Sequence, residues 1–83
     1  MHKFPKEGVL AVEVRLFATL RENRGQVVDV QWNKGMSGFD LLTALDISDE
    51  DVKIFLINGV HSKPDAILKA EDVIALFPAV GGG

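Results

Sequence analysis

Residues 10–17, LAVEVRLF, alternate in polarity and decide how the fold begins. In an extended chain one face would carry Leu10, Val12, Val14 and Leu16, and the other Ala11, Glu13, Arg15 and Phe17. A period of two with one apolar face predicts a β-strand that is buried on one side. Phe17 is the exception, because it places an aromatic ring on the largely polar face.

A second strand is predicted at residues 26–32, QVVDVQW, where Val28, Val30 and Trp32 share one face. The connection between the two strands contains ATLREN, residues 18–23, which predicts a short helical turn before Gly25. A connection of this length is compatible with an antiparallel pair.

A helix is predicted over residues 37–45. Ser37 suits the N-cap position, and Asp40 three residues later gives an aspartate version of the capping box. Met36 before the cap and Leu41 after it have the spacing of a hydrophobic staple. The apolar face of this helix is predicted to comprise Phe39, Leu41, Leu42 and Leu45.

Residues 53–57, KIFLI, predict a third strand that is apolar on both faces, which favours a central place in the sheet. Asn58-Gly59 is a hairpin signal, because both residues tolerate positive φ, and it leads to a short strand at residues 60–61. The last strand is predicted at residues 73–77, VIALF, and Pro78 ends it because proline has no N–H to extend a ladder.

The order strand, strand, helix, strand, short strand, strand predicts one two-layer α+β domain at residues 9–78. One main helix packs on one face of a mixed sheet of about four or five strands. Residues 1–8 are expected to be a disordered extension, and residues 79–83 an extended, flexible glycine tail.

Composition excludes several classes of function for this chain of 83 residues. The net charge of −3 argues against a nucleic-acid partner, which requires a basic face. No apolar run has the length of a membrane span, so no membrane partner is expected. The chain has no cysteine, which excludes disulfides and thiolate chemistry, and we expect a cytoplasmic protein.

The sequence contains no pattern typical of an enzyme. His2 and His61 are the only histidines, and neither has a partner at the spacing of a metal site or a catalytic triad. The acidic run at residues 46–51 lacks the ligand alternation and the glycine of a calcium loop. We therefore expect no catalytic residue, no metal site and no stably bound cofactor.

Two features point to function at the surface. Phe17 and Phe77 are aromatic residues that the alternation does not bury; they form either a thin second hydrophobic layer or a protein interface. The ending FPAVGGG, residues 77–83, is either a frayed end or a thin tail that presents the carboxylate of Gly83 to another protein. Adenylation with ATP would make that carboxylate reactive.

Three stretches carry a resemblance to a known family: VRLFATLRE at residues 14–22, LINGVHS at 56–62 and EDVIALFPAVGGG at 71–83. The chain resembles the MoaD/ThiS sulfur-carrier family of ubiquitin-like β-grasp proteins, and its MoaD branch most closely. The resemblance implies a non-catalytic carrier. An E1-like adenylyltransferase of the MoeB or ThiF type would adenylate Gly83 with ATP, and a persulfide sulfur donor would convert it to a thiocarboxylate.

In the MoaD branch the sulfur goes to molybdopterin while the carrier is docked on a MoaE-like large subunit of molybdopterin synthase. Gly82 and Gly83 match the family's glycine pair, and Gly81 stands where relatives often carry Ala, Ser or Thr. By this resemblance Gly81 and Gly82 thread the tail into the partner. The partner interface maps to Phe17, His61, Phe77 and Pro78.

Two departures and several alternatives accompany this resemblance. Ala79 replaces the second proline of the usual pair, and His61 sits near a position that is often apolar in MoaD proteins. The alternatives are a ThiS-like carrier for the thiamine thiazole, a carrier for a tungsten cofactor, and a ubiquitin-like modifier that joins Gly83 to lysines. A binding module that does not use Gly83 is a further alternative.

Overall fold

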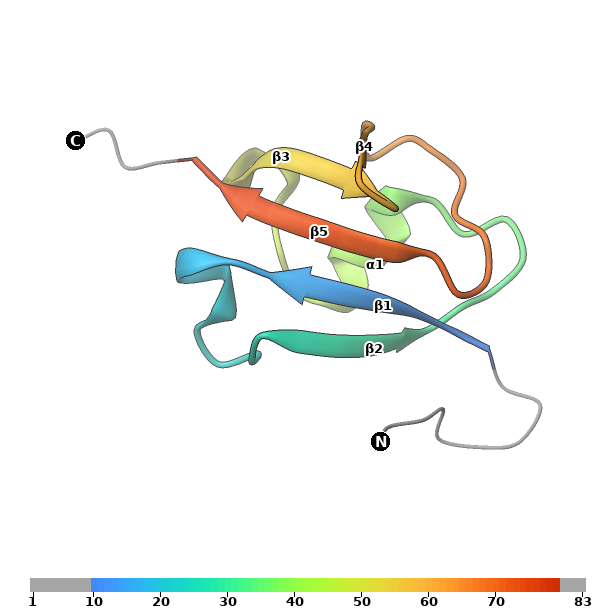
Figure 1. The fold of residues 1–83 in the computed structure, drawn as a ribbon, viewed down its shortest axis with the longest axis horizontal. Coiled ribbons are helices and arrows are strands. Elements are labelled where there is room, and N and C mark those ends of the chain that lie inside the picture. Colours follow the sequence, from blue (N-terminus) through green and yellow to red (C-terminus); the bar gives the residue numbers. More distant parts are fainter. Residues whose placement is uncertain (1–9, 80–83) are drawn as a thin grey trace.

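The computed structural model of the protein describes residues 10–79. Its strands are β1 (Ala11–Leu16), β2 (Val27–Gln31), β3 (Val52–Ile57), β4 (Val60–His61) and β5 (Val73–Pro78). One α-helix, α1 (Gly38–Ala44), and two 3-10 turns, η1 (Ala18–Arg21) and η2 (Asp49–Asp51), complete the chain order (Figure 1). The predicted order of elements is confirmed, including the helical turn after the first strand.

The strands form one mixed sheet in the order β2-β1-β5-β3-β4. The pair of β1 and β5 is parallel, and the other neighbours are antiparallel. The middle strand of the sheet is β5, and β3, which was predicted to be central, is an interior strand between β5 and β4. Both β3 and β5 are apolar on both faces, so hydrophobicity could not rank them.

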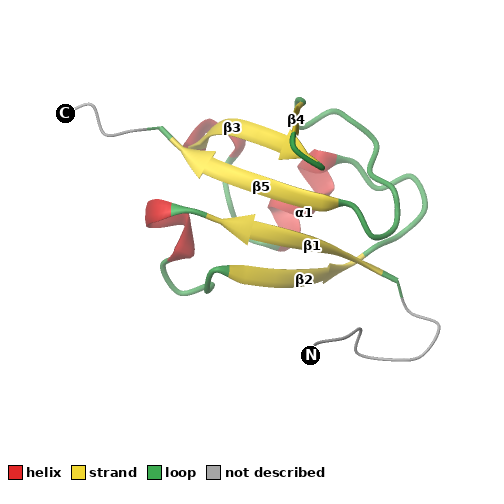
Figure 2. Ribbon diagram, viewed as in Figure 1, coloured by secondary structure: helices red, strands yellow, loops and turns green. Residues whose placement is uncertain are grey.

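The helix covers one face of the sheet, which gives a two-layer α+β fold (Figures 1 and 2). The core lies between the layers, and its most deeply buried side chains are Val12, Val14, Leu16, Leu41, Leu42, Leu68, Ile74 and Leu76. The alternation of the first strand is confirmed from Val12 onward. Leu10 precedes β1 and is 39% exposed, contrary to its predicted place on the buried face.

The predicted capping box starts α1. The Ser37 hydroxyl accepts a hydrogen bond from the Asp40 N–H, and the Asp40 carboxylate accepts one from the Ser37 N–H at 3.0 Å. The prediction that Phe39 faces the core is wrong, because its side chain is 46% exposed. Gly38 takes the inward position instead, and the next residue lies about 100° further round the helix.

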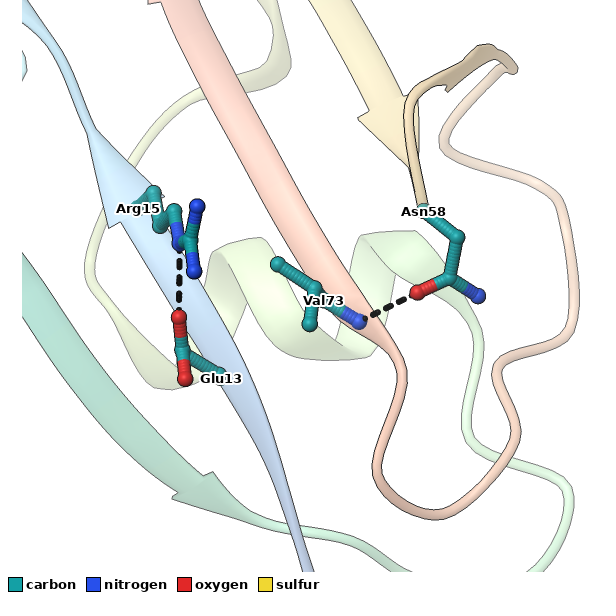
Figure 3. Close-up of polar contacts among 4 residues, drawn as sticks. All are labelled: Glu13, Arg15, Asn58 and Val73. Carbon is teal, nitrogen blue, oxygen red and sulfur yellow. Dashed lines mark hydrogen bonds and ion pairs between the residues drawn. The ribbon is translucent and has the colours of Figure 1, made fainter. Parts of the chain in front are cut away.

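The hairpin at Asn58-Gly59 is confirmed by positive φ values of 52° and 85°. The Asn58 side-chain oxygen accepts a hydrogen bond from the Val73 N–H at 2.9 Å (Figure 3), and its amide nitrogen donates to Asp72 Oδ1 at 2.9 Å. The other Asp72 oxygen accepts from the Lys69 N–H at 2.8 Å. These bonds fasten the hairpin to the start of the central strand.

The last strand extends one residue further than predicted. Pro78 is the final residue of β5 and lies opposite Val52, across an irregularity of register between Val52 and Ile54. Proline is tolerated at the end of a strand, where the missing N–H removes no interior bond. The strand therefore continues to the point where the chain leaves the sheet at Ala79.

Candidate functional site at the end of the central strand

Phe17 and Phe77 form a stacked pair on the sheet face opposite α1. The parallel register pairs Leu16 with Leu76, so the residue that follows each one lies beside its counterpart. The two ring centroids are 4.2 Å apart and the ring planes differ by 8°. Both side chains are half-buried. The structure therefore brings together the two aromatic residues that the alternation of their strands does not bury.

Arg21, at the end of η1, holds Phe17 from a second direction. Its Nε donates a hydrogen bond to the Leu16 carbonyl oxygen at 2.9 Å, and its guanidinium carbon lies 5.5 Å from the centroid of the Phe17 ring. That distance is within the range of a cation–π interaction. The ring thus contacts both a phenyl group and a cation, which fixes its orientation.

A groove of about 340 Å³ opens beside this stack, at the end of β5. Its lining is mostly apolar and consists of Phe17, Ala18, Thr19, Lys53, Ile54, Phe77, Pro78 and Ala79. Half-buried apolar residues that surround a groove are the usual anchors of a protein interface. The groove lies where the chain leaves the sheet at Ala79.

His61 lies on the same sheet face but outside the groove. It pairs with Leu56, which pairs in turn with Ala75, and paired residues of neighbouring strands share a face. His61 is exposed on the edge strand β4, so two strands separate it from Phe17. The structure thus groups Phe17, Phe77 and Pro78 and leaves His61 at the rim of the face.

The part of this face that β1 contributes is charged. Arg15 and Glu13 project from β1 and form an ion pair of 2.6 Å between Nε and Oε2 (Figure 3). The apolar groove therefore has polar surroundings on the β1 side. Exposed pairs of this kind contribute little to stability.

A second hollow, of about 360 Å³, adjoins the groove and shares Thr19, Pro78 and Ala79 with it. Its other lining residues are Leu20, Arg24, Ile47, Glu50 and Asp51. Sequence reasoning did not place Ala18, Thr19, Lys53 or Ile54 at the site. Only the pairing of β3 with β5 and the fold of η1 reveal them, and no local pattern signals either.

The residues assigned to the tail, Gly81, Gly82 and Gly83, and the predicted disordered extension at 1–8 lie outside the described residues. Within residues 10–79 no group of three acidic or histidine side chains is placed to hold a metal ion. In the same range, no helix has the length and apolar character to cross a membrane.

A protein-family model, described as ThiS family, matches residues 14–83 of the sequence. The matched range includes the stacked aromatics and the three C-terminal glycines. The chain belongs to the ThiS family. The resemblance seen in the sequence is thereby confirmed. No curated protein matches the chain.

Three solved structures share the fold of this ThiS-family protein. Small archaeal modifier protein 1 of H. volcanii has a TM-score of 0.72 and 26% identity, over 86% of this chain and 99% of that chain. The Pyrococcus furiosus protein named as molybdopterin converting factor, subunit 1, has a TM-score of 0.70 and 23% identity, over 86% and 99%. Urm1 from Trypanosoma brucei has a TM-score of 0.69 and 10% identity, over 94% and 100%.

At 23% and 10% identity, the last two structures show the fold alone. The fold is that of the ubiquitin-like β-grasp proteins, and the family match places the chain in a family of small sulfur carriers and ubiquitin-like modifiers. Proteins of the ThiS and MoaD type are generally non-catalytic. The family match includes the end of β5 and the residues that follow it.

Proposed function

We propose that this protein is a sulfur carrier whose Gly83 carboxylate becomes a thiocarboxylate, and that it serves as the small, non-catalytic subunit of a molybdopterin synthase. The apolar groove at the end of β5 is the observation that carries this proposal. The groove is a docking surface that ends at Ala79, just before the C-terminal glycines that match the family's ending.

The chemistry requires partners that supply ATP activation and sulfur. In an E1-like adenylyltransferase of the MoeB or ThiF type, a Gly83 oxygen attacks the α-phosphorus of ATP, and pyrophosphate leaves. A persulfide sulfur then attacks the acyl carbon and AMP leaves, which gives an acyl disulfide. A thiol reduces the S–S bond, is itself oxidised to a disulfide, and the thiocarboxylate is released.

The described surface suits this role because it binds rather than reacts. Phe17 and Phe77 offer a fixed aromatic platform, and Pro78 limits the backbone freedom at the start of the tail. Glycines without Cβ atoms can pass through a channel that admits only backbone. The proposed acceptor is a pterin precursor held by a MoaE-like large subunit.

A ubiquitin-like protein modifier is the second candidate. The 26% identity to small archaeal modifier protein 1 favours it. In that role the same acyl adenylate would end as an isopeptide bond to a lysine. Carriers for the thiamine thiazole or a tungsten cofactor use the same first steps and differ in the acceptor alone.

Intact-mass measurement tests the proposal. The protein is incubated with ATP, the ThiF- or MoeB-type enzyme of the same organism, a persulfide donor and a thiol. We expect a mass gain equal to the exchange of one oxygen for sulfur, mapped to Gly83 and absent without ATP. An unchanged mass, with the enzyme active on another carrier, would contradict the carrier role. Adducts on lysines would favour the modifier.

A further inference from the structure

Arg24 connects η1, which forms one wall of the groove, to the C-terminal end of α1. Its Nε donates to the Leu45 carbonyl oxygen at 3.0 Å, and its Nη2 donates to the Asp46 carbonyl oxygen at 3.0 Å. Leu45 is the C-cap of α1 and Asp46 follows it with φ of 60°. A guanidinium here is favourable, because the last carbonyls of a helix have no intrahelical partner.

The same guanidinium also holds its own segment. Its Nη1 donates to the Leu20 carbonyl oxygen at 3.2 Å and to the Glu22 carbonyl oxygen at 3.4 Å. One planar group therefore bonds four carbonyls from two segments that are more than twenty residues apart in sequence. Lysine could not reproduce this, since its ammonium is a point donor without a fixed fork.

The braced segment carries the contacts that shape the groove. Ala18 and Thr19 in η1 line it, and Arg21 at the end of η1 lies over the Phe17 ring. Ala18 has a positive φ of 55°, so η1 leaves β1 through a conformation that an L-residue adopts at a cost. Figure 2 shows η1 at the end of the sheet where β5 also ends.

We infer that Arg24 is a positioning residue for partner docking: it fixes η1 against the end of α1 and thereby sets the groove wall and the orientation of Phe17. This inference rests on the proposed function, because it assumes that the groove receives the activating enzyme. Arg24 itself need not touch that enzyme. Its loss should weaken docking and leave the reaction of the tail unchanged once the complex has formed.

The test measures ATP–pyrophosphate exchange by the ThiF- or MoeB-type enzyme as a function of carrier concentration. Arg24→Gln removes the charge and the fork, Arg24→Lys keeps the charge alone, and Ser37→Ala is the matched control. Ser37 stabilises the start of α1, far from its C-cap, so its loss lowers stability without touching the groove.

We expect the KM for Arg24→Gln and for Arg24→Lys to rise about fivefold to tenfold, because a displaced groove wall weakens the contacts that the enzyme makes with Phe17 and its neighbours. The kcat should stay within about twofold of the wild type, because a docked carrier presents an unaltered tail. Ser37→Ala should leave both constants unchanged. A KM for Arg24→Gln that matches that of Ser37→Ala, or full rescue by Arg24→Lys, would overturn the inference.

A structural readout separates this inference from the proposed function. The aromatic proton shifts of Phe17 and Phe77 report ring stacking in the free protein, with no enzyme present. They should move in both Arg24 variants and stay fixed in Ser37→Ala. If the wild-type chain is not adenylated while these shifts move as expected, the proposed function fails and the positioning of Phe17 stands. Unmoved shifts in a folded Arg24→Lys protein would contradict the positioning.

Discussion

Phe17 and Phe77 are adjacent because β1 and β5 are parallel neighbours, and their stacking should have its own energy. Leucine at either position keeps apolar volume and removes the ring. We expect a coupling free energy of about 1 kcal/mol between Phe17→Leu and Phe77→Leu, in the range of measured aromatic pairs. Urea unfolding of the two single variants and the double variant gives this value.

A second cycle provides the control for this measurement. Phe17→Leu combined with Val60→Ala should be additive, because Val60 is 66% exposed on the edge strand. Additivity in the aromatic pair as well would mean that the stacked rings contribute no more than their separate burial.

Gly38 is the residue that allows α1 to approach the loop before β5. A Cβ at this position would lie 2.6 Å from the Pro64 carbonyl oxygen and 2.7 Å from Phe55 Cζ. Alanine would favour the helix by about 1 kcal/mol, but a clash with backbone atoms outweighs this gain. We expect Gly38→Ala to lower the free energy of unfolding by about 1–3 kcal/mol.

Thermal unfolding of Gly38→Ala, monitored by circular dichroism, checks this expectation. Thr43→Ala is the matched control, since Thr43 is exposed on the same helix and its replacement should change stability by less than about 0.5 kcal/mol. A Gly38→Ala protein as stable as Thr43→Ala would show that the neighbouring loop moves away easily.

At the scale of elements, the β3–β4 hairpin is held to β5 by Asn58. Alanine removes both side-chain hydrogen bonds and must keep a φ of 52°, whereas glycine removes the bonds without that strain. We expect Asn58→Ala to cost about 2–3 kcal/mol, and Asn58→Gly about 1 kcal/mol less. Equal losses in urea unfolding would assign the whole effect to the hydrogen bonds.

The same scale shows how far the sequence predicts the fold. Alternation identified β1 and β2, and the capping signals located α1, because each depends on neighbours within a few residues. The place of β5 in the middle of the sheet depends on its parallel pairing with β1, and no local pattern encodes this. Phe39 was misplaced because the packing of Gly38 against Pro64 sets the rotation of the helix.

In the candidate site, too, local signals are readable from the sequence and long-range contacts are not. Phe17 and Phe77 stood out because they broke the polarity of their strands, so the sequence could mark them as candidates. It could not predict their stacking, which follows from the register of two strands that are far apart in the chain. Lys53 and Thr19 carry no signal at all, since long-range pairing and a turn bring them to the groove.

At the scale of the whole molecule, the fold separates the core from the groove. Every residue of the main core cluster lies between Val12 and Leu76, and none of them lines the groove. Because β5 is the central strand, the chain leaves the sheet from its most firmly held element. A partner seated in the groove therefore does not compete with the packing of the core.

This separation predicts opposite results for folding and activation when the tail is shortened. Deleting Gly83 leaves a carboxylate at Gly82, so the reactive group survives but is retracted by about 3.3–3.6 Å. A displacement of even about 1 Å from the reacting geometry can cost about a hundredfold in rate. We therefore expect adenylation to fall by at least about a hundredfold, with an unchanged melting temperature.

Gly83→Ala is the second variant in this test. It keeps the length of the chain and its C-terminal carboxylate, and it adds one Cβ atom. If the channel admits only backbone, both variants should fail in ATP–pyrophosphate exchange, while both melt like the wild type. If the alanine variant is adenylated normally and the deletion is not, reach alone is required. Adenylation of the shortened chain at the wild-type rate would show that a carboxylate at Gly82 reaches the active site equally well, and the predicted requirement for tail length would be wrong.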